Sequence, residues 1–173
     1  MVILRVLVVW LLLALPGAAQ QASPQVLIVD SERLFSETLY GRRLAADLAT
    51  QAAALQAEND QIVESLTQEE RSLTLRRPEM TADAFRIAAE AFDAKVQDVR
   101  RVRDAKNVEL QQASIASRAR FENRVQGIIA TIMLERNAVV VLEQRTVILS
   151  VRAANITDDA IVRIDAELAN GGD

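Results

Sequence analysis

The chain of 173 residues contains no cysteine and no histidine. Their absence removes the usual zinc ligands, the Cys–His nucleophile pair, the commonest general base and any disulfide bond. The sequence also has no nucleophile elbow and no phosphate-binding glycine loop. We therefore predict that the protein is not an enzyme, and no residue pattern predicts a cofactor or a metal.

Aromatic residues are scarce as well, at 3% of the chain, which is too few for a surface that stacks on nucleic-acid bases. Acidic residues outnumber basic ones, 24 to 20, so the net charge is -4. Nucleic acids are bound through an excess of clustered basic residues. We therefore predict no nucleic-acid partner.

The first residues have the pattern of a secretory signal peptide. Arg5 precedes an apolar run from Val6 to Leu15, and small residues follow up to Ala19. A membrane anchor is the alternative, but a spanning helix needs about 20 apolar residues and this run is shorter. The pattern predicts a signal peptide over residues 1–19 that is removed on export.

The stretch 42–136 has the periodicity of two long helices that fold back on each other. Pro78 lacks an N–H group and disfavours helix at Arg77, so the first helix should end there. Thr81 can cap the next helix, and Asp83 suits its positive end. The sequence predicts a helical hairpin with its tip near Pro78.

Heptad spacing predicts an apolar seam between the two helices. On the first helix the seam positions are Ala45, Leu48, Ala52, Leu55, Asn59, Ile62, Leu66, Glu69, Leu73 and Arg76. On the second helix Phe85, Phe92 and Val99 recur at intervals of seven, and Arg103 and Lys106 interrupt the stripe. We interpret Asn59 as a residue that specifies the register, with a binding role as the alternative.

The two ends of the chain carry the β-type patterns. Residues 25–30 read as a strand, and Asp30 or Ser31 should cap a short helix over 32–38 that ends before a break at Gly41. Two β-branched runs, 139–142 and 146–151, read as a hairpin. Thr157 or Asp158 should cap a closing helix, which explains Asn155-Ile156-Thr157 better than glycosylation does.

These elements predict an α+β fold in which the long hairpin is inserted into a small β body. We expect residues 20–41 and 137–173 to form the body and residues 42–136 to form the arm. The strands are apolar on both faces, so we expect other subunits to cover them. The residues predicted to make this contact are Val26, Ile28, Val139, Val141, Val147 and Leu149.

The chain resembles the Skp/OmpH family of periplasmic chaperones for outer-membrane proteins. The resemblance rests on the opening from Val26 to Phe35, the long helical middle, and the ending from Val139 through Asn155-Ile156-Thr157-Asp158 to Ile161. It implies a homotrimer in which β segments form a central body and three helical arms surround a cavity. It also implies a periplasmic holdase that binds unfolded outer-membrane proteins without ATP.

Residues on the distal part of the hairpin and a basic group along its second helix are the candidates for client binding. They are Met80, Phe85, Phe92, Arg76, Arg77, Arg100, Arg101 and Arg103. The alternative is that the phenylalanines are core of the seam and the arginines form a solvated face. The basic groups are also candidates for transient contact with a membrane or with lipopolysaccharide.

A structural or adaptor coiled coil of the cell envelope is the competing function. An adaptor would bind one folded partner with a defined stoichiometry, whereas a holdase would bind several unrelated unfolded chains. The number of unrelated unfolded chains that the protein binds therefore distinguishes the two hypotheses.

Overall fold

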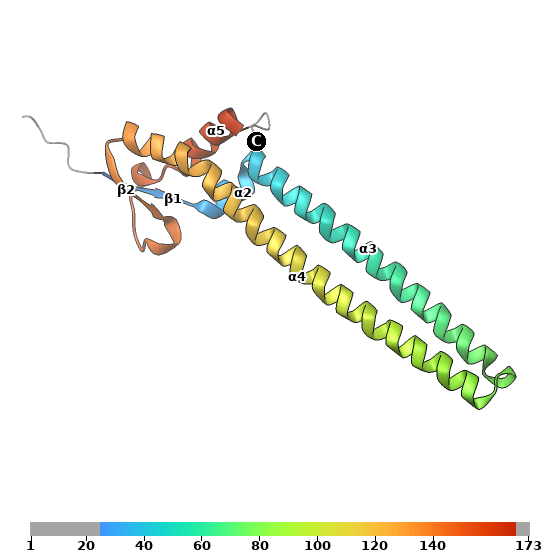
Figure 1. Ribbon diagram of the computed structural model, residues 1–173. Helices are drawn as coiled ribbons and strands as arrows, with labels where there is room; N and C mark the ends of the chain where they lie inside the picture. Colours follow the sequence, from blue (N-terminus) through green and yellow to red (C-terminus); the bar gives the residue numbers. More distant parts are fainter. Residues whose placement is uncertain (1–24, 169–173) are drawn as a thin grey trace, which may run out of the picture.

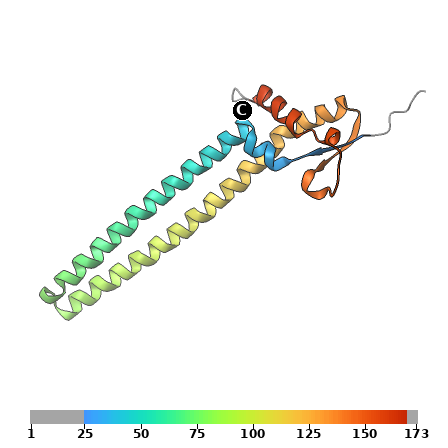
Figure 2. The same ribbon diagram turned by 180° about the vertical axis from the view of Figure 1, so that it is seen from behind.

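The computed structural model describes residues 25–168, so the predicted signal peptide lies outside the described residues. Two long antiparallel helices, α3 (Leu39–Arg76) and α4 (Ala82–Glu135), form an arm that projects from a small body (Figure 1). The body contains β1 (Gln25–Val29), α2 (Ser31–Glu37), β2 (Ala138–Glu143) and α5 (Thr157–Leu168). The view from behind shows the same division (Figure 2). The predicted α+β class with an inserted helical hairpin is confirmed.

The tip of the arm follows the local rules of the sequence. Pro78 lies in the first turn of a short 3-10 helix, η1 (Arg77–Glu79), that follows α3 directly. Thr81 is the N-cap of α4, and its side-chain oxygen accepts a hydrogen bond from the backbone N–H of Ala84 at 3.3 Å. Pro78 and Thr81 therefore end one helix and start the next, as predicted.

The break between α2 and α3 lies at Thr38, not at Gly41 as the sequence suggested. Asp30 caps α2 by accepting from the N–H of Arg33 at 3.0 Å, which confirms the predicted helix start. Thr38 caps α3 by accepting from the N–H of Gly41 at 3.1 Å. Gly41 is inside the helix, where an added Cβ would lie 1.9 Å from the carbonyl oxygen of Phe35. The glycine permits a close approach of α2 and α3 instead of breaking the helix.

The two strands come from opposite ends of the described chain and pair in parallel. Val26 lies opposite Val140, and Leu27 lies opposite Val141. A parallel pair needs a long crossover connection, and here the connection contains α2 and the whole arm. Leu27, Ile28 and Val29 are all buried, so the predicted N-terminal strand is confirmed and is covered on both faces.

The predicted second strand of the C-terminal hairpin is absent from the described structure. After β2 the chain makes a 3-10 turn, η2 (Gln144–Thr146), and a second one, η3 (Arg152–Ala154). The segment 147–151 between them has the composition of a strand but is not hydrogen-bonded into the sheet. β2 pairs with β1 instead of with its neighbour in sequence, so the β-branched run remains on the surface.

The closing helix α5 is attached to β1 through Thr157. The Thr157 hydroxyl accepts a hydrogen bond from the backbone N–H of Asp30 at 2.9 Å. The side-chain oxygen of Asn155 accepts from the N–H of Thr157 at 2.9 Å. The predicted capping role of Thr157 or Asp158 is therefore wrong, because Thr157 is the first helical residue and its hydroxyl joins two distant elements.

The hydrophobic core lies where the base of the arm meets the body. Phe121 is 2% exposed and packs edge-to-face on Phe35, with ring centroids 5.2 Å apart. The core also contains residues from both strands, both long helices and α5; its best-buried members are Leu27, Leu34, Phe121, Ile132, Ile156, Ala160 and Ile164. The ends of α3 and α4 thus contribute to the core of the body.

Along the rest of the arm the seam is thin, and most of its side chains are only half-buried. The predicted positions Leu48, Leu55, Ile62 and Leu66 lie in it, whereas Ala45, Ala52 and Arg76 are exposed. On α4 the half-buried positions include Phe85, Phe92, Val99, Arg103, Lys106 and Leu110. Arg103 and Lys106 therefore continue the heptad stripe that they were expected to interrupt.

Candidate functional site

The phenylalanines predicted to bind clients lie within the seam. Phe85 and Phe92 are half-buried between the two helices, and Met80 is half-buried at the tip. The Arg77 guanidinium lies over the ring of Phe85, 4.6 Å from its centroid. A stacked cation covers one ring face, so Phe85 offers less apolar surface than the sequence suggested.

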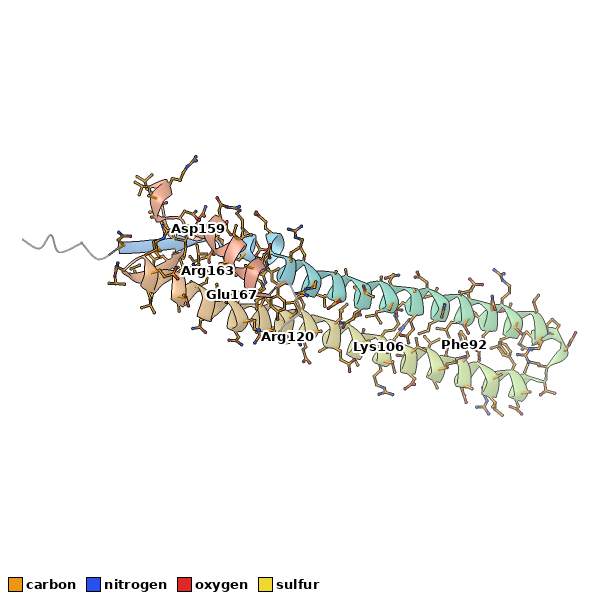
Figure 3. All side chains as sticks on the ribbon, turned by 90° about the horizontal axis from the view of Figure 1, so that it is seen from above. Phe92, Lys106, Arg120, Asp159, Arg163 and Glu167 are labelled. Carbon is orange, nitrogen blue, oxygen red and sulfur yellow. The ribbon has the colours of Figure 1, made fainter. Side chains whose placement is uncertain are left out.

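The predicted arginines do not form one patch. Successive helical residues are rotated by about 100°, so neighbours in sequence lie on different faces. Arg100 and Arg101 are exposed, and Arg101 forms an ion pair with Asp98. Arg103 is half-buried in the seam, while Arg76 is exposed at the end of α3. The structure therefore distributes these charges over the arm. Figure 3 shows the side chains along both helices, with Phe92 and Lys106 labelled.

Two exposed faces of α4, here called flanks, differ in chemistry: one borders the seam, and the other lies on the side of the helix away from it. One flank, here called the polar flank, consists of Arg86, Glu90, Asp93, Gln97, Arg100, Asp104, Asn107, Gln111, Ser114 and Arg118. The other, called the apolar flank, consists of Ala84, Ile87, Ala91, Ala94, Asp98, Arg101, Ala105, Val108, Gln112, Ile115 and Ala119. Each set repeats at alternating intervals of three and four residues, which places its members on one face.

The apolar flank is open to solvent. Ile87 is 60% exposed, Val108 52% and Ile115 65%, although each is a large apolar side chain. Its two charged members, Asp98 and Arg101, are paired with each other. The stripe is present in the sequence as a repeat at intervals of three and four residues, whereas the aromatic residues lie at other heptad positions. The arm thus presents a stripe of alanines and three large apolar side chains, interrupted at Asp98, Arg101 and Gln112, that no other described part of the chain covers.

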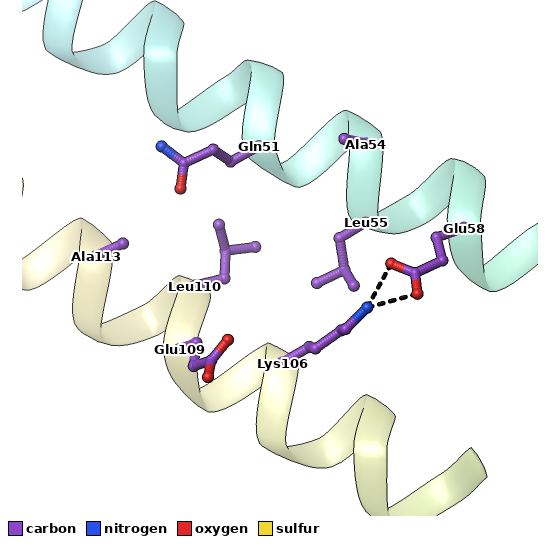
Figure 4. Close-up of a pocket in the computed structure, with 8 residues that line it drawn as sticks. All are labelled: Gln51, Ala54, Leu55, Glu58, Lys106, Glu109, Leu110 and Ala113. Carbon is purple, nitrogen blue, oxygen red and sulfur yellow. Dashed lines mark hydrogen bonds and ion pairs between the residues drawn. The ribbon is translucent and has the colours of Figure 1, made fainter.

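Shallow grooves lie between the two helices in the middle of the arm. The larger one, about 450 Å³, is lined by Leu55 and Glu58 of α3 and by Lys106 and Leu110 of α4, among others (Figure 4). Lys106 donates to Glu58 across it, with Nζ to Oε2 at 2.6 Å. The pair connects the helices where the apolar seam is open.

A second exposed apolar surface lies on the body. Ile148 and Leu149, in the segment 147–151, are 104% and 90% exposed. A groove of about 600 Å³ runs along β2 and is lined by Val125, Ile129 and Met133 of α4. Within residues 25–168, β2 pairs with another strand along only one edge. An apolar extended segment and an unpaired apolar strand edge therefore occur on the same subunit.

The residues predicted to join subunits divide into two groups. Val26, Val139 and Leu149 are exposed, and Val141 and Val147 are half-buried. Ile28 is only 3% exposed and is buried within its own subunit. The exposed members can reach another chain, whereas Ile28 supports the sheet from inside.

Ion pairs attach α5 to its neighbours in the body. Arg33 donates to Glu37 and also to Asp158 at the start of α5, at 2.9 Å in the second case. The hydrogen bond from Arg33 lowers the pKa of Glu37, and the hydrogen bond to Glu37 raises the pKa of Arg33. Arg136 is paired with Asp159, and Arg163 with Glu135. These contacts orient α5 against the base of the arm.

Residues 25–168 contain no cluster of three or more potential metal-ligating side chains. Nor does any of the described helices combine the length and the apolarity needed to cross a bilayer.

Known proteins resemble this chain in sequence and in structure. A family model of outer membrane proteins of the OmpH-like type matches residues 25–164. A crystal structure of a candidate OmpH-like outer membrane chaperone from Caulobacter crescentus CB15 is similar, with a TM-score of 0.79. It shares 24% sequence identity, and the alignment covers 90% of this chain and 92% of that chain. No curated protein matches the sequence.

Proposed function

The chain belongs to the OmpH-like outer membrane protein family, and from this premise we propose that it is a periplasmic holdase chaperone for unfolded outer-membrane proteins. The observation that carries the proposal is the apolar flank of α4, which remains exposed over residues 84–119 of this 54-residue helix. A long exposed apolar surface is unusual on a soluble protein unless it contacts another molecule. The proposal includes export of the chain and removal of residues 1–19.

Client contacts are proposed to be many and weak. The strands of outer-membrane barrels alternate apolar and polar residues, and before folding their apolar faces lack cover. Ile87, Val108 and Ile115 can each contact such a face without enclosing it. Several weak contacts on tethered arms raise the effective concentration of the client. Folding of the client in the membrane then competes with its binding to the arms and releases it, so release needs no nucleotide.

The residues near the tip are proposed to add to this surface. Met80, Phe85 and Phe92 are half-buried, so they become available to a client only when the two helices separate. Arg76, Arg100 and Arg101 are exposed and can contact acidic groups of a client, of a membrane or of lipopolysaccharide without any change in the arm. The apolar flank is the main contact and the tip residues are the secondary one.

The proposed working form is a homotrimer whose contacts lie in the body. Support comes from the exposed segment 147–151 and from the unpaired edge of β2 beside its apolar groove. Addition of this segment to the β2 edge of a neighbouring subunit would satisfy backbone hydrogen bonds and cover Ile148 and Leu149. Such a head-to-tail contact forms a ring when the rotation between subunits closes, and a trimer is the ring of three subunits. The arm proper is then the part of the hairpin beyond the shared core, about residues 48–117.

The test measures aggregation of an unfolded outer-membrane barrel by light scattering, with the wild-type trimer and with Ile87→Gln/Val108→Gln/Ile115→Gln. We expect the variant to lose most of its suppression of scattering. The matched control is Val63→Gln/Val162→Gln, which removes exposed apolar side chains elsewhere and should hold clients normally. Normal holding by the flank variant while its trimer stays intact would overturn the proposed surface. Binding of one folded partner at fixed stoichiometry would instead support an adaptor.

A further inference from the structure

The apolar flank of α4 is complementary to a second copy of itself laid in the opposite direction. When two copies lie antiparallel about a point between Asp98 and Arg101, each flank member from residue 84 to residue 115 is opposite another member. The opposing pairs are Ala84–Ile115, Ile87–Gln112, Ala91–Val108, Ala94–Ala105 and Asp98–Arg101. The match arises because alternating intervals of three and four residues are the same in either direction.

Side-chain sizes are complementary in this arrangement. Val108 and Ile115 each lie opposite an alanine, and Ile87 lies opposite the amide side chain of Gln112. A large side chain opposite a small one fills the groove between two helices without a clash. At ~1.5 Å per residue the contact is roughly 50 Å long. Antiparallel pairing therefore covers the large apolar side chains that one arm leaves open to solvent.

The two charged members of the flank select the alignment. Asp98 and Arg101 pair within one helix, but their side chains are 62% and 76% exposed, so each can accept a second partner. In the antiparallel pair each Asp98 is opposite the Arg101 of the other copy, and the symmetry makes this contact twice. A shift by one heptad would place both charges opposite alanine or valine, which removes water without providing a partner. One antiparallel register is thus favoured over its neighbours.

A parallel contact between two flanks would bring like charges together. Asp98 would lie beside Asp98 of the other copy, and Arg101 beside Arg101, which costs free energy. Arms that project from one body run parallel to each other. The antiparallel partner therefore belongs to a second assembly of the same chain.

The outward face of α3 lacks this complementarity. Its positions on the side away from the seam, again three and four residues apart, are Asp47, Thr50, Ala54, Ala57, Gln61, Glu64, Gln68 and Arg71. Most of these residues are polar, and none is a large apolar residue. The apolar character of the α4 flank is therefore not a general feature of the outer surface of the arm.

We propose that the apolar flank of α4 is a self-association surface, through which an arm pairs antiparallel with an arm of a second assembly. Asp98 pairs with Arg101 of the other copy at the centre, and Val108 and Ile115 pack against alanines on both sides of it. The tip of each arm then points toward the body of the other assembly. The inference concerns two copies of this chain and does not depend on client binding.

Sedimentation of the whole protein tests the charged centre. Between about 1 μM and 1 mM we expect the mass of the wild-type assembly to double. Asp98→Arg places four arginines together and should weaken doubling at least about tenfold. Asp98→Arg/Arg101→Asp exchanges the two charges, rebuilds the contact and should restore doubling. The control Asp104→Arg makes the same change of charge on the polar flank and should leave doubling unchanged.

Disulfide cross-linking tests the direction of the pair. The chain has no cysteine, so Ala94→Cys/Ala105→Cys introduces its only thiols. Oxidation should link position 94 of one chain to position 105 of another. Within one helix these positions are about 16 Å apart, too far for an internal disulfide. In the control Ala84→Cys/Ala105→Cys the thiols of paired arms are offset by about 15 Å, so it should not cross-link.

Mapping of the linked peptides gives the decisive outcome. Links of 94 to 94 and of 105 to 105 would show a parallel contact and would overturn the proposal. A wild-type mass that stays constant over the whole concentration range would also overturn it, as would doubling that Asp98→Arg leaves unaltered. Neither measurement includes a client, so a failure here is distinct from a failure of the proposed function.

Discussion

The body and the arm are stabilised in different ways. In the body, side chains from both ends of the chain are almost completely buried around Phe121 and Ile164. In the arm beyond Leu48, Asn59 and Leu73 are the only buried residues within the described structure before Phe121. The body therefore depends on long-range packing, whereas the arm depends on helix propensity, two caps and one thin seam. Equivalent substitutions should have unequal effects in the two regions.

The largest contrast is expected between two phenylalanines. Phe121→Ala removes a ring that is 2% exposed, which should lower the free energy of unfolding by about 3–5 kcal/mol. Phe92→Ala removes a half-buried ring from the seam and should cost roughly 1–2 kcal/mol. Urea unfolding followed by circular dichroism measures both. Equal losses would show that the arm is packed as tightly as the body.

Two glycines should respond to alanine with opposite signs. Gly41→Ala in the body places a Cβ 1.9 Å from the carbonyl oxygen of Phe35, so the crowding should cost about 1–3 kcal/mol. Gly127→Ala places a Cβ on α4 with nothing within 4 Å and should gain about 0.5–1 kcal/mol. The shift of Tm gives the sign in each case. A tolerated Gly41→Ala would show that α2 and α3 move apart easily.

Two threonine caps offer a smaller contrast. Thr38 is fully buried, accepts from Gly41 and donates to the carbonyl oxygen of Leu34 at 2.7 Å, so Thr38→Ala should cost about 1–3 kcal/mol. Thr81→Ala removes an exposed cap at the tip and should cost about 0.5–1 kcal/mol. In Thr81→Ala, hydrogen exchange should be faster than in the wild type only at the start of α4, because the effect of losing this cap is local. Serine at either position, which keeps the hydroxyl, is the control.

The smallest expected effect is a pH dependence confined to the body. Arg33 lowers the pKa of Glu37 below its unfolded value, so this carboxylate stabilises the fold above the unfolded pKa. That contribution is lost as the pH falls through the folded pKa. Glu37→Gln should therefore reduce Tm slightly at neutral pH and leave it unchanged in acid. Glu90→Gln removes the ion pair with Arg86 and is the matched substitution in the arm, with which the Tm change of Glu37→Gln is compared. A persistent loss in acid would mean that Glu37 acts through packing.

Local signals in the sequence predicted much of the arm and part of the body. Pro78, Thr81 and Asp30 act on residues a few positions away, and the structure confirms their roles. The expected partner of β2 was wrong because strand pairing is not local. β2 pairs with β1, from the other end of the chain, and not with the adjacent run 147–151. Composition could show that this run suits a strand, but not that its own subunit leaves it unpaired.

The candidate surface was harder to predict because residue type was a poor guide to exposure. Phe85 and Phe92 were the most conspicuous apolar residues, yet packing in the seam buries part of their surface. Ile87 and Ile115 are less conspicuous but face solvent. Arg103 was expected to interrupt the seam and instead lies within it, where the length of its side chain keeps it half-buried. The heptad position of each residue, not its type, decides these cases.

The contact between Asp30 and Thr157 has a consequence for how the chain folds. These residues are 127 positions apart, so during synthesis the body cannot close until almost the whole described chain has been made. The contacts of the helical hairpin are closer in sequence, 26 positions for Lys95–Glu69 and 48 for Lys106–Glu58, so the hairpin can form first from its tip. Once formed, it brings Tyr40 and Phe121 side by side and turns a very long loop into a short one, which reduces the entropy cost of joining the ends. The arm thus serves as the scaffold on which its own body is assembled.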